Sequence, residues 1–305
     1  MNADPDTQLV RVDGRQLALK RLDKLLYPES GTTKAEVLDY YARIAPVLLR
    51  YLADRPVTRI RWPDGVQTKP FFEKNVPVHT PSWLPTVVLP TPGSSRNLET
   101  LRFPLISDTA GLIWAVNLAA LELHVPQWTV GPRGKVHNPN RLVIDLDPGE
   151  PAGLAECAEA ATLIAERLAD DGLAAVPVTS GSKGLQLYAP LDGSNSPEAV
   201  LHYAKALAES VAKQHPKLLV AKMAKVLRGG KVFLDWSQNN AAKTTICPYS
   251  MRGRARPWVA APRSWDELAD GANLVQLEIG EVLDRVAERG DLAEALFDQP
   301  GRLPR

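Results

Sequence analysis

The chain has 305 residues, of which 45% are hydrophobic and 23% are charged, and its formal net charge is +1. This length can bury a substantial core and favours two lobes around one cleft, while no stretch is apolar enough to span a membrane. The N-terminus carries Asp4 and Asp6 without an apolar segment, so we expect no signal peptide and a cytoplasmic protein. Cys157 and Cys247 stand far apart, which argues against a zinc module or a disulfide framework.

The first part of the chain predicts two helices separated by a proline-rich stretch. Residues 33–53 place apolar side chains at helical spacing, with Thr32 or Thr33 as the N-cap. The stretch 76–92 is rich in proline, which is typical of loops and edge strands. Residues 112–123 are predicted to form the second helix.

The second part of the chain predicts strands that alternate with helices. The expected elements are a strand over 141–149, a helix over about 153–170, strands near 174–179 and 185–189, a helix over 197–214 and a strand over 232–235. The acidic segment from Val275 to Val286 predicts an amphipathic helix packed on the body. This order indicates an α/β fold of the mixed α+β type.

Two aspartates one residue apart, Asp145 and Asp147, end the apolar strand and are followed by Pro148 and Gly149. On a strand, both carboxylates point to the same face, roughly 7 Å apart. Two like charges this close are unfavourable unless a cation lies between them or one carboxyl is protonated, and of these a divalent metal with oxygen ligands is favoured. Asp-Pro-Gly is also ordinary turn chemistry. Asp235, at the end of another predicted strand, supplies a third carboxylate and supports the metal site.

The small net charge conceals an uneven distribution along the chain. From Lys217 to Arg263 there are ten Lys or Arg against one acid, Asp235, and from Ser264 to Pro300 there are two Arg against ten acids. A charge run is usually only a solvated face. Because the basic block surrounds a candidate metal ligand, we favour a polyanionic substrate beside the metals.

The segment from Ser180 to Gly184 is a short glycine-rich loop between two predicted strands. Its glycines let backbone N–H groups approach a phosphate and Lys183 adds a positive charge, so the loop is a candidate for holding a triphosphate. A plain tight hairpin is the alternative. The loop is not a Walker loop, because the spacing differs and a strand rather than a helix follows.

Lysines and aromatic residues in the first part of the chain predict contacts to nucleic acid. Lys24 and Lys34 flank a short turn, and Phe71 and Phe72 lie between two further lysines. Adjacent aromatics are often one core and one surface residue, but beside lysines they suit stacking on single-stranded or frayed nucleic acid. His124 either caps a helix or lies near a phosphate or sugar.

Four motifs occur in one order along the chain, over residues 145–149, 179–185, 232–240 and 243–254. Together they resemble the polymerase domain of bacterial ligase D, a member of the archaeo-eukaryotic primase superfamily, and stand-alone bacterial Prim-Pol proteins of the same family. The resemblance implies a primase-like catalytic core with central mixed sheets flanked by helices. It implies an N-terminal lobe over 1–130 with contacts to a DNA 5'-phosphate and template. It also implies a catalytic lobe over 131–305 with the nucleotide and metal site, and the two lobes are expected to form one compact unit.

The resemblance also implies roles for individual residues. Asp145, Asp147 and Asp235 are expected to bind two divalent ions, manganese or magnesium, for two-metal nucleotidyl transfer. The residues expected to bind the nucleotide are His124, Ser180, Lys183, Gln238, Lys243 and Arg252. Those expected to bind DNA are Lys24 and Lys34 at the 5'-phosphate, Phe71 and Phe72 on the template, and Arg228 near the primer or templating base.

One departure from the family pattern concerns the candidate nucleotide site. Gln186 stands where the family commonly has histidine, so an amide takes the place of an imidazole. Such an amide cannot titrate but can still donate a hydrogen bond. The chain ends at Arg305 without a ligase or nuclease segment, and we favour a stand-alone relative over an excised domain.

The expected function is therefore that of a template-directed primase-polymerase that fills short gaps and extends ends during DNA break or excision repair. It would add ribo- or deoxynucleotides, act as a nucleoid-associated monomer on DNA with a 5'-phosphate, and cooperate with a DNA ligase and a Ku-like end-binding protein. One alternative is a metal-dependent phosphohydrolase of the Asp-x-Asp type, which Gly149 disfavours because that class usually has Thr or Val there. A third hypothesis is a non-catalytic module that bridges DNA ends and has a vestigial metal site. The intact Asp145, Asp147 and Asp235 disfavour it.

Overall fold

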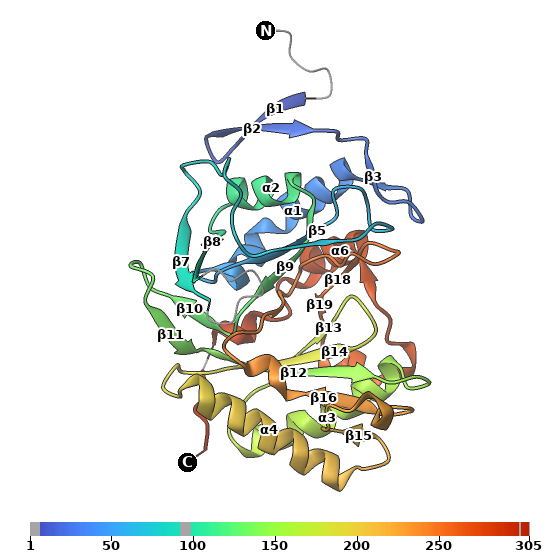
Figure 1. Cartoon of the computed structure of the whole chain (residues 1–305). Helices are drawn as coiled ribbons and strands as arrows, with labels where there is room; N and C mark the ends of the chain where they lie inside the picture. Colours follow the sequence, from blue (N-terminus) through green and yellow to red (C-terminus); the bar gives the residue numbers. More distant parts are fainter. Residues whose placement is uncertain (1–6, 92–98, 299, 305) are drawn as a thin grey trace.

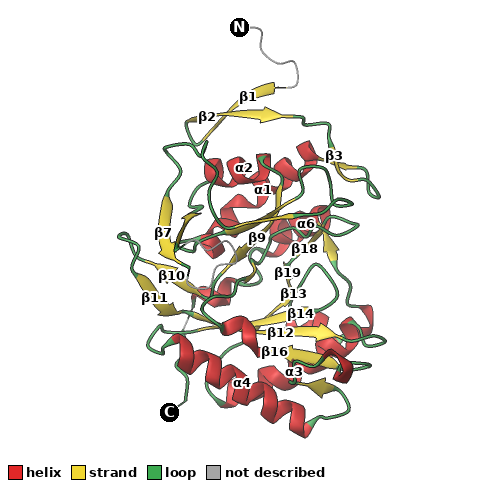
Figure 2. Ribbon diagram, viewed as in Figure 1, coloured by secondary structure: helices red, strands yellow, loops and turns green. Residues whose placement is uncertain are grey.

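The computed structural model describes residues 7–91, 99–298 and 300–304, folded into two halves stacked along the long axis of the molecule (Figure 1). Helices and strands are mixed in both halves (Figure 2). The helices are α1 (Lys34–Leu52), α2 (Thr109–Asn117), α3 (Leu154–Asp170), α4 (Pro197–Gln214), α5 (Trp265–Ala269) and α6 (Ile279–Arg289). No helix of the described residues is long and apolar enough to cross a membrane.

A six-stranded sheet forms the framework of the lower half in Figure 1. Its strands, in spatial order, are β15 (Leu219–Val220), β16 (Val232–Asp235), β12 (Arg141–Pro148), β14 (Leu185–Pro190), β13 (Val176–Thr179) and β19 (Ala261–Pro262). Only β15 and β16 pair in parallel, and the other neighbours are antiparallel. The sheet is thus mixed, which confirms the predicted fold class, and α3 and α4 pack on one of its faces.

Side chains alternate between the two faces of β12, as the pleat of a strand requires. Leu142, Ile144 and Leu146 pack with α3 and α4 in one apolar core. Val143 packs in a second core, which lies on the opposite face of the sheet and includes residues of both halves. Asp145 therefore shares the face of Val143 and is turned toward the space between the two halves.

A four-stranded antiparallel sheet lies in the upper half, in the order β17 (Thr245–Ile246), β9 (Ala120–Val125), β5 (Thr58–Arg61) and β6 (Phe71–Glu73). Five two-stranded sheets complete the described strands. They pair β1 (Thr7–Val12) with β2 (Arg15–Lys20), β3 (Leu25–Tyr27) with β4 (Thr32–Thr33), β7 (Thr86–Pro90) with β8 (Thr100–Pro104), β10 (Trp128–Val130) with β11 (Val136–Pro139), and β18 (Trp258–Val259) with β20 (Leu277–Glu278).

One apolar core joins the two halves. It contains Tyr41 of α1 and Leu121 of β9 together with Val178 and Tyr188 of the six-stranded sheet. Late segments of the chain also return to the upper half, since β17 pairs with β9 and α6 packs near α1. The two halves are thus continuous in their packing, while a lobe boundary near residue 130 stays a prediction.

Local sequence explains where the long helices begin. The side chain of Thr33 accepts a hydrogen bond from the Glu36 backbone N–H, and the Glu36 carboxylate accepts one from the Thr33 N–H, which forms a capping box. The Ser196 side chain caps α4 by accepting from the Ala199 N–H, and Pro197 occupies the first turn, where its missing N–H is harmless. The helices predicted over 33–53 and 197–214 are thereby confirmed.

Two sequence predictions of secondary structure are wrong in part. The helix predicted over 112–123 ends at Asn117, and Ala119 then adopts a φ of 60° that turns the chain into β9. His124 consequently lies on a strand and caps no helix. The acidic segment becomes helical only at Ile279, because Leu277 pairs in β20 instead.

Candidate active site

The three predicted carboxylates meet at the end of the six-stranded sheet that faces the upper half. Asp145 on β12 stands directly opposite Asp235 on β16, and Asp147 follows on the same face of β12. Directly opposed residues of an antiparallel pair hold their Cβ atoms about 4.5–5.5 Å apart. The fold therefore brings together the acids that the sequence separates by ninety positions.

The electrostatics of these acids favour a cation between them. Burial raises the pKa of Asp145, and the charge of Asp147 raises it further. Burial also raises the pKa of Asp147, with a contribution from Asp235, although Arg228 and Arg252 oppose this shift. The cluster offers only hard oxygen donors, which suit magnesium or manganese rather than a soft metal.

The Asp235 carboxylate is bound by its own neighbours in this structure. Its Oδ1 accepts hydrogen bonds from the N–H and the hydroxyl of Ser237, and its Oδ2 accepts one from Gln238 Nε2 at 2.8 Å. Lys243 in turn donates to the Ser237 hydroxyl. Among the described residues, no three His, Cys, Asp or Glu side chains are arranged as ligands of one metal ion.

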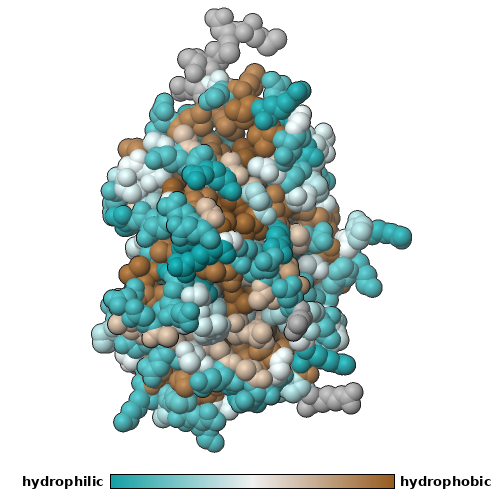
Figure 3. All heavy atoms as spheres, turned by 180° about the vertical axis from the view of Figure 1, so that it is seen from behind, coloured by the Kyte–Doolittle hydropathy of each residue, from teal (hydrophilic) through white to brown (hydrophobic). Residues whose placement is uncertain are grey.

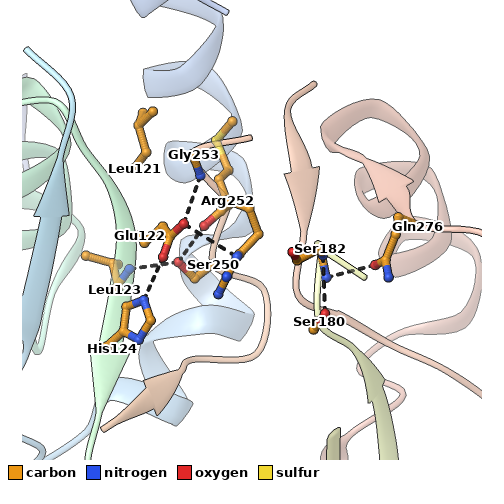
Figure 4. Close-up of polar contacts among 12 residues, drawn as sticks. Leu121, Glu122, Leu123, His124, Ser180, Ser182, Ser250, Arg252, Gly253 and Gln276 are labelled. Carbon is orange, nitrogen blue, oxygen red and sulfur yellow. Dashed lines mark hydrogen bonds and ion pairs between the residues drawn. The ribbon is translucent and has the colours of Figure 1, made fainter. Parts of the chain in front are cut away.

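The loop from Ser180 to Gly184 is held in a fixed shape by hydrogen bonds. Ser180 Oγ accepts from the N–H groups of Ser182 and Gly184, both at 3.3 Å, which leaves its own proton free for a ligand. Gln276 lies beside the loop (Figure 4), where it accepts from the Gly181 N–H at 2.8 Å. It also donates to the Gly184 carbonyl at 3.2 Å. The loop is thus a supported structure and more than a plain hairpin.

Gly184 also lets this loop pack directly against β12, the strand that carries Asp145 and Asp147. A Cβ atom at Gly184 would lie 2.0 Å from the carbonyl oxygen of Leu146, so no larger residue fits without a backbone shift. Lys183 at the tip is 72% exposed and pairs with Glu150 at 2.9 Å. Because an exposed pair of this kind contributes little stability, a phosphate can replace Glu150 as the partner of Lys183.

A second polar cluster faces the loop from the upper half (Figure 4). His124 Nε2 lies 2.7 Å from Glu122 Oε2, and Arg252 Nε lies 3.4 Å from Glu122 Oε1. Sequence reasoning missed Glu122, because a helix was expected there. The alternation of apolar and polar residues over 120–125 would have placed Glu122 and His124 on one strand face.

Gln186 lies opposite Asp145 on β14 and contacts it. The Tyr188 hydroxyl donates to Gln186 Oε1 at 2.9 Å, which orients the amide NH₂ group away from Tyr188. A hydrogen bond from Gln186 to Asp145 opposes the rise in the pKa of that carboxyl. The amide is therefore a fixed donor to one of the three central acids.

Lys24 and Lys34 lie close together in the upper half, at β3 and the start of α1. Lys34 is only 7% exposed, and its ammonium donates to the Lys20 carbonyl and to Asn117 Oδ1, both at 2.7 Å. Burial and the nearby charges of Arg21 and Lys24 lower the pKa of Lys34 to about 8. Lys24 donates to Asp64 at 2.7 Å. A locally concentrated positive charge of this kind suits a phosphate.

The remaining predicted contacts to DNA lie on the surface. Phe71 and Phe72 are 60% and 55% exposed, so both are available for stacking. The guanidinium carbon of Arg228 lies 3.6 Å from the centre of the Phe233 ring. The Arg228 main chain lies against Gly149, where a Cβ atom would meet the Arg228 carbonyl oxygen at 2.0 Å.

Figure 3 shows the molecule from behind the view of Figure 1, and on this face hydrophobic residues are bordered by hydrophilic ones.

Comparison with known proteins gives consistent matches over most of the chain. The family model for the LigD primase-polymerase domain matches residues 33–293. The multifunctional non-homologous end joining DNA repair protein LigD of Mycobacterium tuberculosis is 48% identical over 287 residues, which is 92% of this chain. The bifunctional non-homologous end joining protein LigD of Bacillus subtilis is 32% identical over 280 residues, or 90% of this chain.

A solved structure agrees with the sequence matches. The polymerase domain of Mycobacterium tuberculosis ligase D in complex with DNA superposes with a TM-score of 0.87 at 47% identity, over 93% of this chain and 99% of that one. This chain spans only 37% of the length of the mycobacterial protein and 43% of the Bacillus subtilis protein. The similarity thus concerns one part of those larger proteins.

Proposed function

Since the chain belongs to the LigD primase-polymerase family, we propose that it is a template-directed nucleotidyltransferase that fills short gaps and extends ends in broken DNA. The observation that carries this proposal is the register that sets Asp145 opposite Asp235, with Asp147 on the same face. Carboxylates that can hold metal ions, placed beside a preformed glycine-rich loop, form an arrangement that suits the binding of a nucleoside triphosphate.

Asp145, Asp147 and Asp235 are the residues that would hold two magnesium or manganese ions. When bound, such ions lower the pKa of the attacking primer hydroxyl and neutralise charge on the leaving pyrophosphate. The mutual repulsion of these acids supports the assignment, because each carboxylate gains from a cation placed between them. Gln186 restricts Asp145 to one orientation through its hydrogen bond.

The chain's own residues would bind the nucleotide from two sides. The loop offers the free proton of Ser180 and the exposed ammonium of Lys183 to phosphate oxygens. From the other side, His124 and Arg252 add an imidazole and a guanidinium, and Lys243 stands beside Asp235 through Ser237. Gln238 would have to release its hydrogen bond to Asp235 in order to donate to the nucleotide instead.

The upper half would bind the DNA. Lys24 and Lys34 are proposed to hold a 5'-phosphate on the downstream strand of a gap, since the two lysines lie close together, and burial together with the charges of Arg21 and Lys24 lowers the pKa of Lys34. Phe71 and Phe72 are proposed to stack on the template, because both rings are exposed. Arg228 is proposed to lie near the primer or the templating base, on a segment that touches the aspartate strand at Gly149.

The biological setting follows from the names of the relatives, which are non-homologous end joining proteins. We propose that this chain acts in DNA break repair with a DNA ligase and a Ku-like end-binding protein, and that it accepts both ribo- and deoxynucleotides. We also propose that it works as a monomer.

One assay separates this proposal from the alternatives. The protein is incubated with gapped DNA that carries a 5'-phosphate, with manganese and each of the four nucleotides in turn, against each templating base. A polymerase adds the complementary nucleotide to the primer, a phosphohydrolase releases phosphate without primer extension, and a bridging module does neither. Absence of template-dependent addition would refute the proposed activity.

A further inference from the structure

Glu122 is a buried acid in the candidate active site to which no role has yet been given. It is 4% exposed and lies on β9, with His124 two residues later on the same strand face. Its carboxylate has three partners: His124 Nε2 at 2.7 Å, Gly253 N–H at 3.0 Å and Arg252 Nε at 3.4 Å. Two of these partners are residues proposed above to bind the nucleotide.

The main chain on both sides of Glu122 is anchored. The Tyr41 hydroxyl donates to the Leu121 carbonyl, and the Leu123 N–H donates to Ser250 Oγ at 2.9 Å. The Arg252 carbonyl accepts from the Tyr27 hydroxyl at 2.7 Å. Neither the strand nor the 250–253 segment can shift without losing buried hydrogen bonds, so the position of the Glu122 carboxylate is fixed.

The charge state of Glu122 is also fixed at neutral pH. Burial alone would raise its pKa, but the hydrogen bond with His124, the charges of Arg252 and His124 and the Gly253 N–H lower that pKa to about 2. An ionised carboxylate can only accept hydrogen bonds. His124 Nε2 must therefore carry a proton, which leaves Nδ1 as the ring nitrogen available to a ligand.

We propose that Glu122 is a positioning residue that sets the tautomer and orientation of His124 and fixes the direction of the Arg252 side chain toward the bound nucleotide. One carboxylate thereby orders both arms of the cluster that faces the loop from Ser180 to Gly184 (Figure 4). This inference rests on the proposed nucleotide-binding function. The proposed role depends on the two nitrogens of the imidazole ring. The hydrogen-bond partner of one ring nitrogen determines whether the other nitrogen donates or accepts a hydrogen bond.

The isosteric substitution Glu122→Gln removes the charge and keeps the shape. We expect the KM for the incoming nucleotide to rise about tenfold, with a smaller change in kcat, because the two binding groups lose their common anchor. In a His124→Ala background the same substitution should raise KM by a clearly smaller factor, since part of its effect passes through His124. Equal effects in both backgrounds, or an unchanged KM, would overturn the proposal.

The control is Asp171→Asn, which also removes a largely buried carboxylate. Asp171 pairs with Arg167 of α3 and accepts a hydrogen bond from the Tyr203 hydroxyl of α4, both at 2.8 Å. It should leave KM unchanged. A second measurement does not depend on activity and is made on the wild-type protein. Nitrogen NMR of the His124 ring in the wild-type protein, assigned with His124→Ala, should show a proton on Nε2. An unprotonated Nε2 would refute the role of Glu122, whereas a wild type with protonated Nε2 that adds no nucleotide would refute only the proposed function.

Discussion

Asp145 and Asp235 stand directly opposite each other on neighbouring antiparallel strands, although ninety positions separate them in the chain. This pairing places two acids side by side on one face of the sheet, and Asp147 adds a third on the same face of β12. Proteins rarely hold like charges this close together without a compensating cation or function.

Asp145→Asn is expected to stabilise the protein in the absence of divalent metal while abolishing nucleotide addition. The substitution removes one of three mutually repelling carboxylates, so the free energy of unfolding should rise by on the order of 1 kcal/mol. Thermal unfolding in a chelating buffer measures this change. A lower melting temperature than that of the wild type would show that the acids do not repel each other as described.

Binding to a DNA 5'-phosphate should weaken as the pH rises through about 8. Lys34 has its pKa lowered to about 8 by burial and by Arg21 and Lys24, so its ammonium is present below this pH and is lost above it. Fluorescence anisotropy would compare gapped DNA with a 5'-phosphate and with a 5'-hydroxyl between pH 7 and 9. Lys34→Met should remove this pH dependence, and an affinity ratio that stays constant in the wild type would contradict the role of Lys34.

Phe71→Ala together with Phe72→Ala should weaken binding to single-stranded template without loss of stability. Both rings are exposed, and base stacking on an aromatic ring contributes about 1–3 kcal/mol per base. Phe103→Ala is the matched control, because Phe103 is buried in a small core and its removal should lower stability by about 3–5 kcal/mol. A double variant that binds overhangs as the wild type does would exclude stacking.

Gly184→Ala should reduce nucleotide binding and lower the melting temperature. Its new methyl group would meet the Leu146 carbonyl at 2.0 Å, which forces the loop away from the aspartate strand. Gly280→Ala is the control, since Gly280 has open space around its Cβ position and lies in α6. That change should stabilise the helix by about 0.5–1 kcal/mol. Equal melting temperatures and nucleotide affinities for the two variants would argue against close packing of the loop on β12.

Much of the lower sheet could be predicted from the sequence, because strong local signals delimit it. Pro148 and Gly149 end β12, and the glycines around Lys183 separate β13 from β14. The register between β12 and β16 could not be predicted, since strand pairing is set by tertiary packing and no local pattern encodes which residues stand opposite. The convergence of Asp145 with Asp235 was therefore expected from the family resemblance and their places at strand ends.

The segment around Glu122 shows why part of the site escaped prediction. The apolar run before it is compatible with a helix, and the break comes at Ala119, whose positive φ is unusual for a residue other than glycine. No sequence signal marks such a turn. A helix through residue 123 would not give Glu122 and His124 the shared face that they have on β9.

The central claim is tested most directly by single-nucleotide incorporation into a gapped, 5'-phosphorylated DNA with manganese, measured side by side for the wild type, Asp145→Asn and Asp171→Asn. We predict template-dependent addition by the wild type and Asp171→Asn, and addition reduced by at least about a thousandfold in Asp145→Asn, because that substitution removes one of the three carboxylates proposed to hold the metal ions. Incorporation by Asp145→Asn at the wild-type rate would contradict the assignment of the active site, and no incorporation by the wild type would contradict the proposed function itself.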